Sequence, residues 1–188
     1  SIEETLDELR KKIEEVIRRM KKSNDDNEKE NREVIDRIRR TNEEIRKRAE
    51  RVIEDARRKL KSEELTRVLK KLAERLEKIL RESEKRVREL AEELKRLDEE
   101  SKRLVEELVR ELETILRELE KEIRRKRDVK ERVDKLIREV EDLIRRIEEE
   151  NKKSSEENKR LVRRIEKDNE DSIRELEKLI EDIRRTID

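Results

Sequence analysis

The side chains in this chain that could do chemistry are carboxylates, serines and asparagines, because it contains no histidine and no cysteine. A serine nucleophile needs an activating base. Ser83, Ser101 and Ser154 are expected to have only amides and Asp98 near them. Asp98 itself is the one acidic residue on an inward apolar stripe, and we interpret it as a hydrogen-bond acceptor. A di-metal site in a helical bundle would need Glu-x-x-His pairs. We therefore expect no catalytic, cofactor-binding or metal-binding residue, and no enzyme activity.

Pairs of acidic residues do not change this interpretation. Glu3-Glu4 and the run 148–150 resemble general acid/base candidates, but 60% of the residues are charged. Such pairs arise by chance at that density, and we expect them to form a solvated face.

The composition predicts an all-α fold. Over 188 residues there is no Gly, Pro, Phe, Tyr or Trp, and apolar residues make up 29%. Strands and tight turns draw heavily on the missing residues. Glu, Lys, Arg, Leu and Ile, which dominate, all support helix.

The charge pattern argues against several kinds of partner. The formal net charge is +1 and the two signs are interspersed, whereas a nucleic-acid-binding protein normally carries a basic face. No apolar run exceeds two residues, so we expect no membrane span. No secretory signal or lipidation motif is recognisable, and the localisation stays unknown.

Apolar residues recur at helical spacing, with an eighteen-residue repeat. Val16, Val34 and Val52 illustrate it, as do Leu72 and Leu90. Eighteen residues in five turns is 3.6 residues per turn, the period of a straight α-helix, whereas a strict heptad would impose a left-handed supercoil. We therefore expect long helices with little supercoil.

Capping signals divide the chain into three helices. Ser1-x-x-Glu4 is a capping box, Asp128-x-x-Glu131 resembles one, and Ser62 precedes two glutamates. The outermost apolar residues run from Ile2 to Leu60, Leu65 to Ile123 and Val129 to Ile187. We predict helices of about 60 residues at 2–60, 63–125 and 129–187, with short connections near 61–62 and 126–128. Short connections make neighbours antiparallel, which gives one up-down-up three-helix bundle domain spanning 1–188.

A rival segmentation would break the chain at 23–27 and again at 151–155. The sequence Ser-Asn-Asp-Asp-Asn is a reasonable loop in a natural protein. Two features oppose this reading. The eighteen-residue phase runs unbroken through both stretches, and the polar residues find partners at the same height.

Those partners follow from the expected register of the helices. If Leu60 lies beside Leu65, facing residues of the first two helices have numbers that sum to about 125, and the third helix is level with the first at an offset of about 127. Polar residues then meet at shared heights, with one apolar exception, Leu94 opposite Asn31. The expected polar layers contain Asn24, Asn27, Asn31, Asn42, Ser83, Asp98, Ser101, Asn151, Ser154, Asn158, Asn169 and Ser172. Buried amides and hydroxyls are tolerable when hydrogen-bonded, so we interpret these as hydrogen-bond layers that set helix register.

Taken together, these features resemble de novo designed straight helical bundles with buried hydrogen-bond networks. The resemblance rests on the eighteen-residue repeat, the matched segments, the missing Gly, Pro and aromatic residues, and the aligned Asn and Ser layers, and it covers the whole chain. It implies a structural scaffold with no natural biochemical function, no cofactor and no required partner.

Two other functions remain open: an engineered switch or interaction module that accepts a partner helix, and a natural spacer resembling spectrin-type bundles. Because surface positions are almost wholly charged, we expect no exposed apolar patch of interface size and a monomeric chain.

Overall fold

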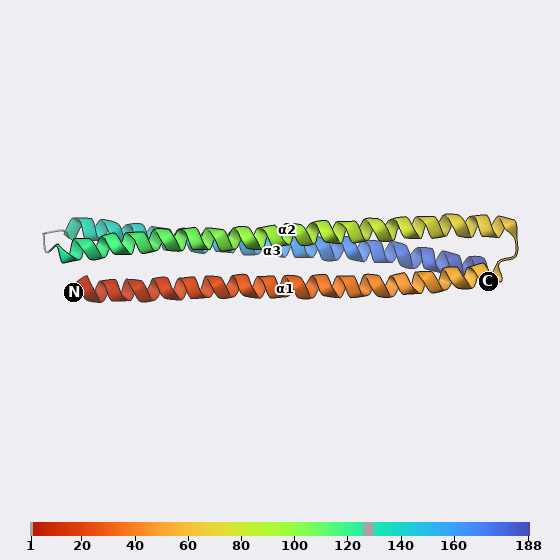
Figure 1. The fold of residues 1–188 in the computed structure, drawn as a ribbon, viewed down its shortest axis with the longest axis horizontal. Coiled ribbons are helices and arrows are strands. Elements are labelled where there is room, and N and C mark those ends of the chain that lie inside the picture. Colours follow the sequence, from red (N-terminus) through yellow and green to blue (C-terminus); the bar gives the residue numbers. More distant parts are fainter. Residues whose placement is uncertain (1, 126–129) are drawn as a thin grey trace. The chain divides into compact units, whose positions relative to one another are not determined.

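The computed structural model describes residues 2–125 and 130–188. They form α1 (Ile2–Lys59), α2 (Glu63–Arg124) and α3 (Lys130–Ile187), which are labelled in Figure 1. No strand occurs in these residues. The three helices pack against one another, so the predicted all-α three-helix bundle is confirmed. The observed ends of the helices lie within one residue of the predicted ones.

The connection between α1 and α2 contains only Leu60, Lys61 and Ser62. The Leu60 amide still donates to the Ala56 carbonyl at 2.9 Å, as in a helix. The Ser62 carbonyl already accepts from the Thr66 amide at 3.0 Å and from the Thr66 hydroxyl at 2.8 Å. Ser62 therefore occupies the N-cap position of α2.

Charges at these two helix ends favour the helix dipoles. The last turn of α1 is basic and the first turn of α2 is acidic. The predicted caps Ser1 and Asp128, and the second connection at 126–128, lie outside the described residues.

The residues group into two compact units. Unit 1 contains residues 1–29 and 95–159, and unit 2 contains residues 30–94 and 160–188. Each unit holds a segment of every helix. In each, α2 runs antiparallel to α1 and α3, because the start of α1 packs with the end of α2 in unit 1 and the reverse holds in unit 2.

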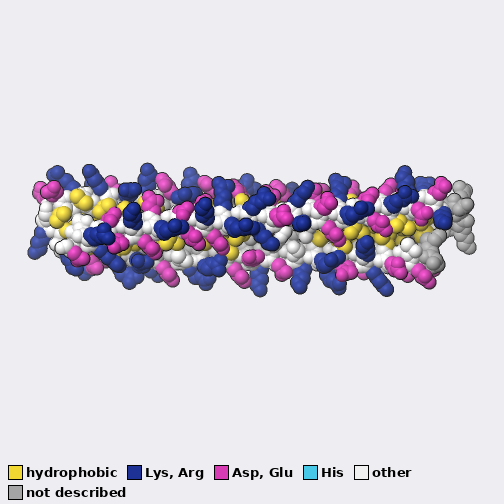
Figure 2. Space-filling model, turned by 180° about the vertical axis from the view of Figure 1, so that it is seen from behind, with side chains coloured by type: hydrophobic (Ala, Val, Ile, Leu, Met, Phe, Trp, Pro, Cys, Tyr) yellow, Lys and Arg dark blue, Asp and Glu magenta, His cyan; other side chains and the backbone are white. Residues whose placement is uncertain are grey.

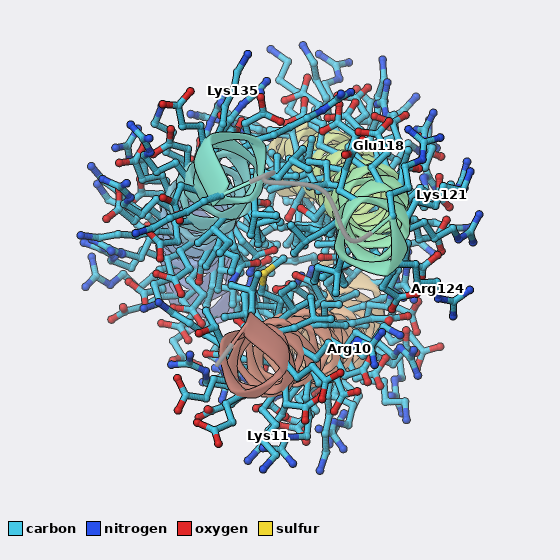
Figure 3. The ribbon with its side chains drawn as sticks, turned by 90° about the vertical axis from the view of Figure 1, so that its left-hand side faces the viewer. Arg10, Lys11, Glu118, Lys121, Arg124 and Lys135 are labelled. Carbon is cyan, nitrogen blue, oxygen red and sulfur yellow. The ribbon has the colours of Figure 1, made fainter. Side chains whose placement is uncertain are left out.

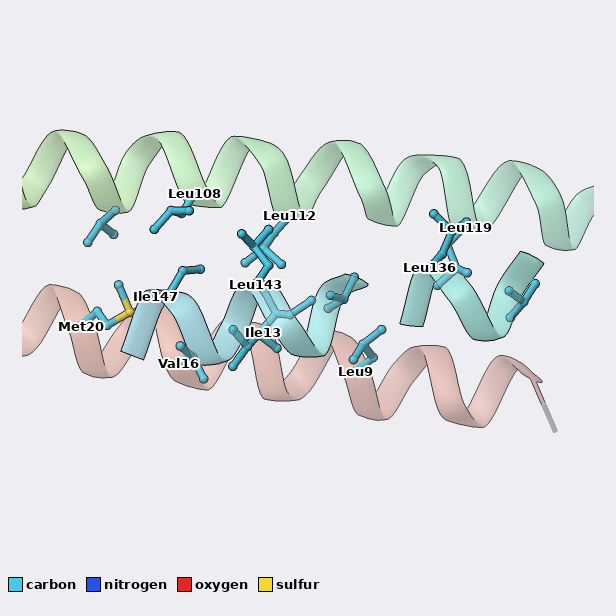
Figure 4. Packing of buried hydrophobic residues seen from close by; sticks show 14 residues of the cluster. Leu9, Ile13, Val16, Met20, Leu108, Leu112, Leu119, Leu136, Leu143 and Ile147 are labelled. Carbon is cyan, nitrogen blue, oxygen red and sulfur yellow. The ribbon is translucent and has the colours of Figure 1, made fainter. Parts of the chain in front are cut away.

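The core of unit 1 is one apolar cluster. Ile13, Leu112 and Leu143 come together from the three helices, and Met20 packs near Ile147 (Figure 4). Burying such a side chain fully contributes about 1.5–3 kcal/mol. The three amphipathic stripes therefore account for the assembly of this unit.

The core of unit 2 consists of two apolar clusters. One contains Ile45, Leu80 and Leu176. The other contains Ile38 and Val87. In each helix the residues of one cluster are separated from those of the other by buried polar side chains, described below.

The surface is charged, with one apolar exception. Figure 2 shows Lys and Arg side chains interspersed with Asp and Glu over the face in view, with apolar atoms in narrow strips between them. Among the described residues, the exposed large hydrophobic side chains are Leu65 (39%) and Val68 (42%). None of the described helices contains an apolar stretch long enough to cross a membrane.

The exposure of Leu65 departs from its expected place at the end of an inward stripe. On the register of the polar residues, Leu65 faces Leu60, which lies just past Lys59, the last residue of α1. The start of α2 therefore has little of α1 to cover it.

Candidate functional site: two buried polar layers

The first polar layer, layer A, lies in unit 1 and consists of Asn24, Ser101, Asn151 and Ser154. Asn24 is 8% exposed, and the other three are half-buried. The hydroxyls of Ser101 and Ser154 are hydrogen-bonded to each other. This bond joins α2 to α3. The sequence had placed Ser101 at the height of Asn24, and Ser154 about one turn away at the height of Asn27 and Asp98, so this pairing differs from the predicted one.

Layer A continues into further polar residues. Asn27 and Asp98 are both half-buried. A groove of about 440 Å³ between α1 and α3 is lined by Asn151 together with Ser23 and Ser155. Layer A is therefore the centre of a longer polar stretch that solvent can reach.

An ion pair flanks layer A on the α1–α2 seam. Lys102 donates a hydrogen bond to Glu28 at 2.7 Å. This bond raises the pKa of the Lys102 ammonium above its usual value, and the negative charges of Glu28, Asp25 and Asp98 add to the effect, partly offset by burial. Asp98 thus contributes to the field that keeps Lys102 charged.

The second polar layer, layer B, lies in unit 2 and consists of Asn42, Ser83, Asn169 and Ser172. All four are buried, with exposed fractions between 4% and 9%. The Ser172 hydroxyl donates to the Asp168 carbonyl of its own helix at 3.0 Å and accepts from Arg86 at 3.5 Å. The side-chain oxygens of Asn42 and Asn169 have no hydrogen-bond donor. The structure therefore places the predicted residues in one layer without pairing these two oxygens.

A second ion pair flanks layer B on the same seam. Arg46 donates to Glu84 at 2.6 Å and lies 3.7 Å from Glu77. The hydrogen bond to Glu84 raises the pKa of Arg46, and the neighbouring carboxylates add to this. A groove of about 340 Å³ beside Glu84 is also lined by Asn42.

The two remaining asparagines on the predicted list are buried outside both layers. Asn31 and Asn158 are each 4% exposed, and each takes part in a polar interaction. Asn31 belongs to unit 2, where its expected neighbour Leu94 is also buried, and Asn158 belongs to unit 1.

Sequence reasoning missed a regular set of ion pairs between α1 and α2. The pairs are Arg10–Glu120, Glu28–Lys102 and Arg46–Glu84. Arg10 lies between α1 and α2, while Lys11, Lys121 and Lys135 point outward (Figure 3). Successive pairs are eighteen residues apart in each helix, and the basic partner alternates from α1 to α2 and back. We call these pairs the alternating seam. A search for opposite charges about one turn beyond the facing positions would have found them.

The burial of one carboxylate, that of Glu122, was also not predicted from the sequence. Glu122 in α2 is 7% exposed and lies 3.4 Å from Arg132 in α3 and 3.7 Å from Arg125. Glutamate is rarely buried unless it is paired, and two arginines neutralise it here. We interpret this cluster as structural support near the end of α2.

The chemistry available in these layers is hydrogen bonding between neutral side chains. Among the described residues, no group of three His, Cys, Asp or Glu side chains is arranged to hold a metal ion. Layers A and B each hold two asparagines and two serines, and each residue of one layer is displaced from its counterpart by eighteen positions along the helix. Comparison of this chain with protein-family models, with curated proteins and with solved structures gives no match.

Proposed function

We propose that this chain is a designed structural scaffold whose buried polar layers fix the register of three long helices. The observation that supports this most strongly is the duplication of one four-residue polar layer, once in each unit, at the eighteen-residue offset of the apolar repeat. A repeating design rule that places one polar layer at each eighteen-residue offset produces this duplication directly.

The layers act against short slips of one helix along another. Apolar turns of Leu, Ile and Val resemble one another, so a slip of one turn disturbs apolar packing little. In layer B such a slip brings Ile38 or Ile45 to the height of Asn42 and leaves Ser83 and Asn169 facing an apolar side chain. Each buried polar group that loses its partners costs about 1–3 kcal/mol. A single buried asparagine can fix register in coiled coils by the same means.

Register can be measured directly, because the chain contains no cysteine to interfere with labelling. The exposed residues Glu43 and Glu82 lie at facing heights of α1 and α2 in unit 2 and can each be replaced by a spin-labelled cysteine. We expect one narrow distance distribution in the parent chain. With Asn and Ser of both layers replaced by Leu and Ala, a second distribution, displaced by about one helical turn, should appear.

A matched control keeps the layers and removes apolar contacts. Ile45→Val in the labelled chain lowers stability by about 0.5–1.5 kcal/mol but should leave a single distance. If the variant without layers also keeps one narrow distance, the proposed role of the layers is wrong.

A second function is favoured by the polarity of the α1 interface. Three buried side chains of α1, Asn24, Asn31 and Asn42, are asparagines, and polar layers weaken an interface relative to apolar ones. The chain would then be a module from which one helix is exchanged for a partner helix. Producing residues 1–61 and 62–188 as separate pieces tests this. Exchange of labelled α1 within minutes supports a module, and no exchange over days supports the scaffold.

A further inference from the structure

The connection between α1 and α2 is unusually close to being helical. Lys61 is the one residue between the last backbone bond of α1, made by the Leu60 amide, and the first carbonyl of α2 that accepts one, Ser62. Neither glycine nor proline, the residues that normally end helices, is present. Of residues 60–62, only Ser62, the N-cap of α2, favours a break, and none of the three is incompatible with a continuous helix.

Straightening this connection would satisfy backbone groups that the turn leaves without helical partners. Apart from the bonds of the Leu60 and Thr66 amides, the last carbonyls of α1 and the first amides of α2 lack partners within their own helices. One continuous helix from Ile2 to Arg124 would pair them with each other. In such a helix α1 would point away from its own α2 and α3, so its apolar and asparagine-bearing face would need a new surface.

A second copy of this chain offers that surface. Every ion pair that joins α1 to another helix, such as Glu28–Lys102 or Arg37–Glu166, can form unchanged when the two partners come from different copies. We propose that two copies exchange α1 through a straightened connection and form a closed dimer in which each α1 packs on the α2 and α3 of the other copy.

The exposed residues beside the connection support this partner. Leu65 and Val68 lie within two turns of Ser62, on the first turns of α2, and are exposed. In the exchanged dimer, the symmetry axis would pass near the two straightened connections. The same residues of both copies would then meet there and cover one another, whereas in the monomer they stay in water.

The alternating seam determines how α1 of the second copy can enter. Layers A and B are the same at an eighteen-residue offset, so they do not by themselves exclude a slip of eighteen residues. That slip would set Glu28 against Glu120 and Arg46 against Lys102 in one direction. In the other it would set Arg10 against Lys102 and Glu28 against Glu84. Like charges would meet either way, which favours a closed dimer over staggered open chains.

Refolding at two concentrations tests the exchange. The full chain is unfolded in guanidinium chloride and refolded at micromolar and at millimolar concentration, and then examined by size-exclusion chromatography with light scattering. We expect the 23.2 kDa monomer at low concentration and a species of twice that mass at high concentration. The exchanged dimer should persist for hours after dilution, because its return to monomer requires α1 to unfold from the other copy.

Two opposed variants of the connection sharpen the test. Lys61→Ala with Ser62→Ala favours helix, and Lys61→Gly with Ser62→Gly disfavours it. A glycine lowers helix formation about fivefold per position relative to alanine. The dimer contains four such positions, so the dimerisation constants of the two variants should differ by about 10³-fold. Leu65→Gln with Val68→Gln should reduce dimer formation while leaving the helicity and denaturation midpoint of the monomer unchanged.

Each outcome decides the proposal. A persistent dimer that is enriched in the alanine variant and lost in the glycine variant supports it. A dimer that dissociates within minutes of dilution, or whose amount is the same in both variants, indicates side-by-side association and overturns it. Monomer alone in the alanine variant after refolding at millimolar concentration also overturns it.

Discussion

Layers A and B are built from the same residue types but differ in their surroundings. In layer A the serine hydroxyls bond across two helices and three of the four side chains are half-buried. In layer B all four are buried, the Ser172 hydroxyl bonds to its own helix, and two amide oxygens lack a donor. Identical polar side chains at corresponding positions thus reach different hydrogen-bonding states.

The residues one turn away explain the difference. Asn27 and Asp98 extend layer A with polar groups, whereas their counterparts eighteen residues away, Ile45 and Leu80, are buried apolar residues beside layer B. Polar neighbours let water supply missing hydrogen bonds. Beside apolar neighbours, the side-chain oxygens of Asn42 and Asn169 lack a donor. The same polar residues are therefore more costly in layer B.

The largest effect is expected from removing layer B. Asn42→Leu, Ser83→Ala, Asn169→Leu and Ser172→Ala together should raise the free energy of unfolding by about 3–6 kcal/mol. The two unpaired oxygens each cost about 1–3 kcal/mol, and the new apolar side chains add burial. Guanidinium chloride denaturation of the variant and the parent chain measures the difference.

The matched change in layer A provides the control. Asn24→Leu, Ser101→Ala, Asn151→Leu and Ser154→Ala should raise the free energy of unfolding by only about 0–2 kcal/mol. A cross-helix bond is lost there, and part of the layer is already hydrated. An equal or larger gain in layer A would contradict the assignment of the greater cost to layer B.

Single serine substitutions should have smaller effects, and these effects should lower stability instead of raising it. Ser154→Ala removes a bond between α2 and α3 and should lower stability by about 0.5–1.5 kcal/mol. Ser172→Ala removes a bond to the carbonyl of Asp168 in its own helix, which adds little to helix stability, so its effect should stay within about 0.5 kcal/mol. Denaturation midpoints at constant m-value provide the comparison, and a larger loss for Ser172→Ala would show that the Arg86 contact matters more than the helix bond.

The helices could be predicted from sequence, and so could the burial of Asn42, Ser83 and Asn169, because both follow from periodicity. The bond between Ser101 and Ser154 could not be predicted, because spacing placed Ser154 at the height of Asn27. An eighteen-residue repeat fixes which side chains point inward, and matched helix lengths fix the heights to within about a turn. The unpaired oxygens of Asn42 and Asn169 could not be predicted, because amide orientation depends on local geometry that spacing does not determine. The exposure of Leu65 could not be predicted either, because the matched spacing of the outermost apolar residues does not show that α1 ends at Lys59, before the position that faces Leu65.

The alternating seam was missed because charges are so dense that opposite signs coincide at many facing positions. The expected sum of 125 for facing residues of α1 and α2 also does not predict which charged residues pair. Long Arg, Lys and Glu side chains reach about one turn along the seam and pair at a sum of 130. Ion pairs can therefore be predicted only by comparing charged residues about one turn apart along the seam. Asn and Ser side chains are short, so the residues that they contact lie at nearly the same height as their own backbone.

The smallest expected effect is a difference in pH dependence between two ion pairs, the one beside layer A, Glu28–Lys102, and the one beside layer B, Arg46–Glu84. The pKa of Lys102 is raised in the folded chain. Its contribution to stability is therefore complete below the unfolded value of about 10.4 and is lost as pH rises through the folded value. The pKa of Arg46 is also raised, from a value already above the pH range of the experiment, so Arg46 stays charged throughout.

Double-mutant cycles for Glu28–Lys102 and Arg46–Glu84 should each give about 0.2–1 kcal/mol at pH 8, since both pairs are partly exposed. At pH 11.5 the coupling of Glu28 to Lys102 should fall toward zero while that of Arg46 to Glu84 persists. Lys102→Arg should restore the coupling to Glu28 at high pH. A coupling of Glu28 to Lys102 that did not change between pH 8 and pH 11.5 would show that the lysine charge does not contribute to this seam.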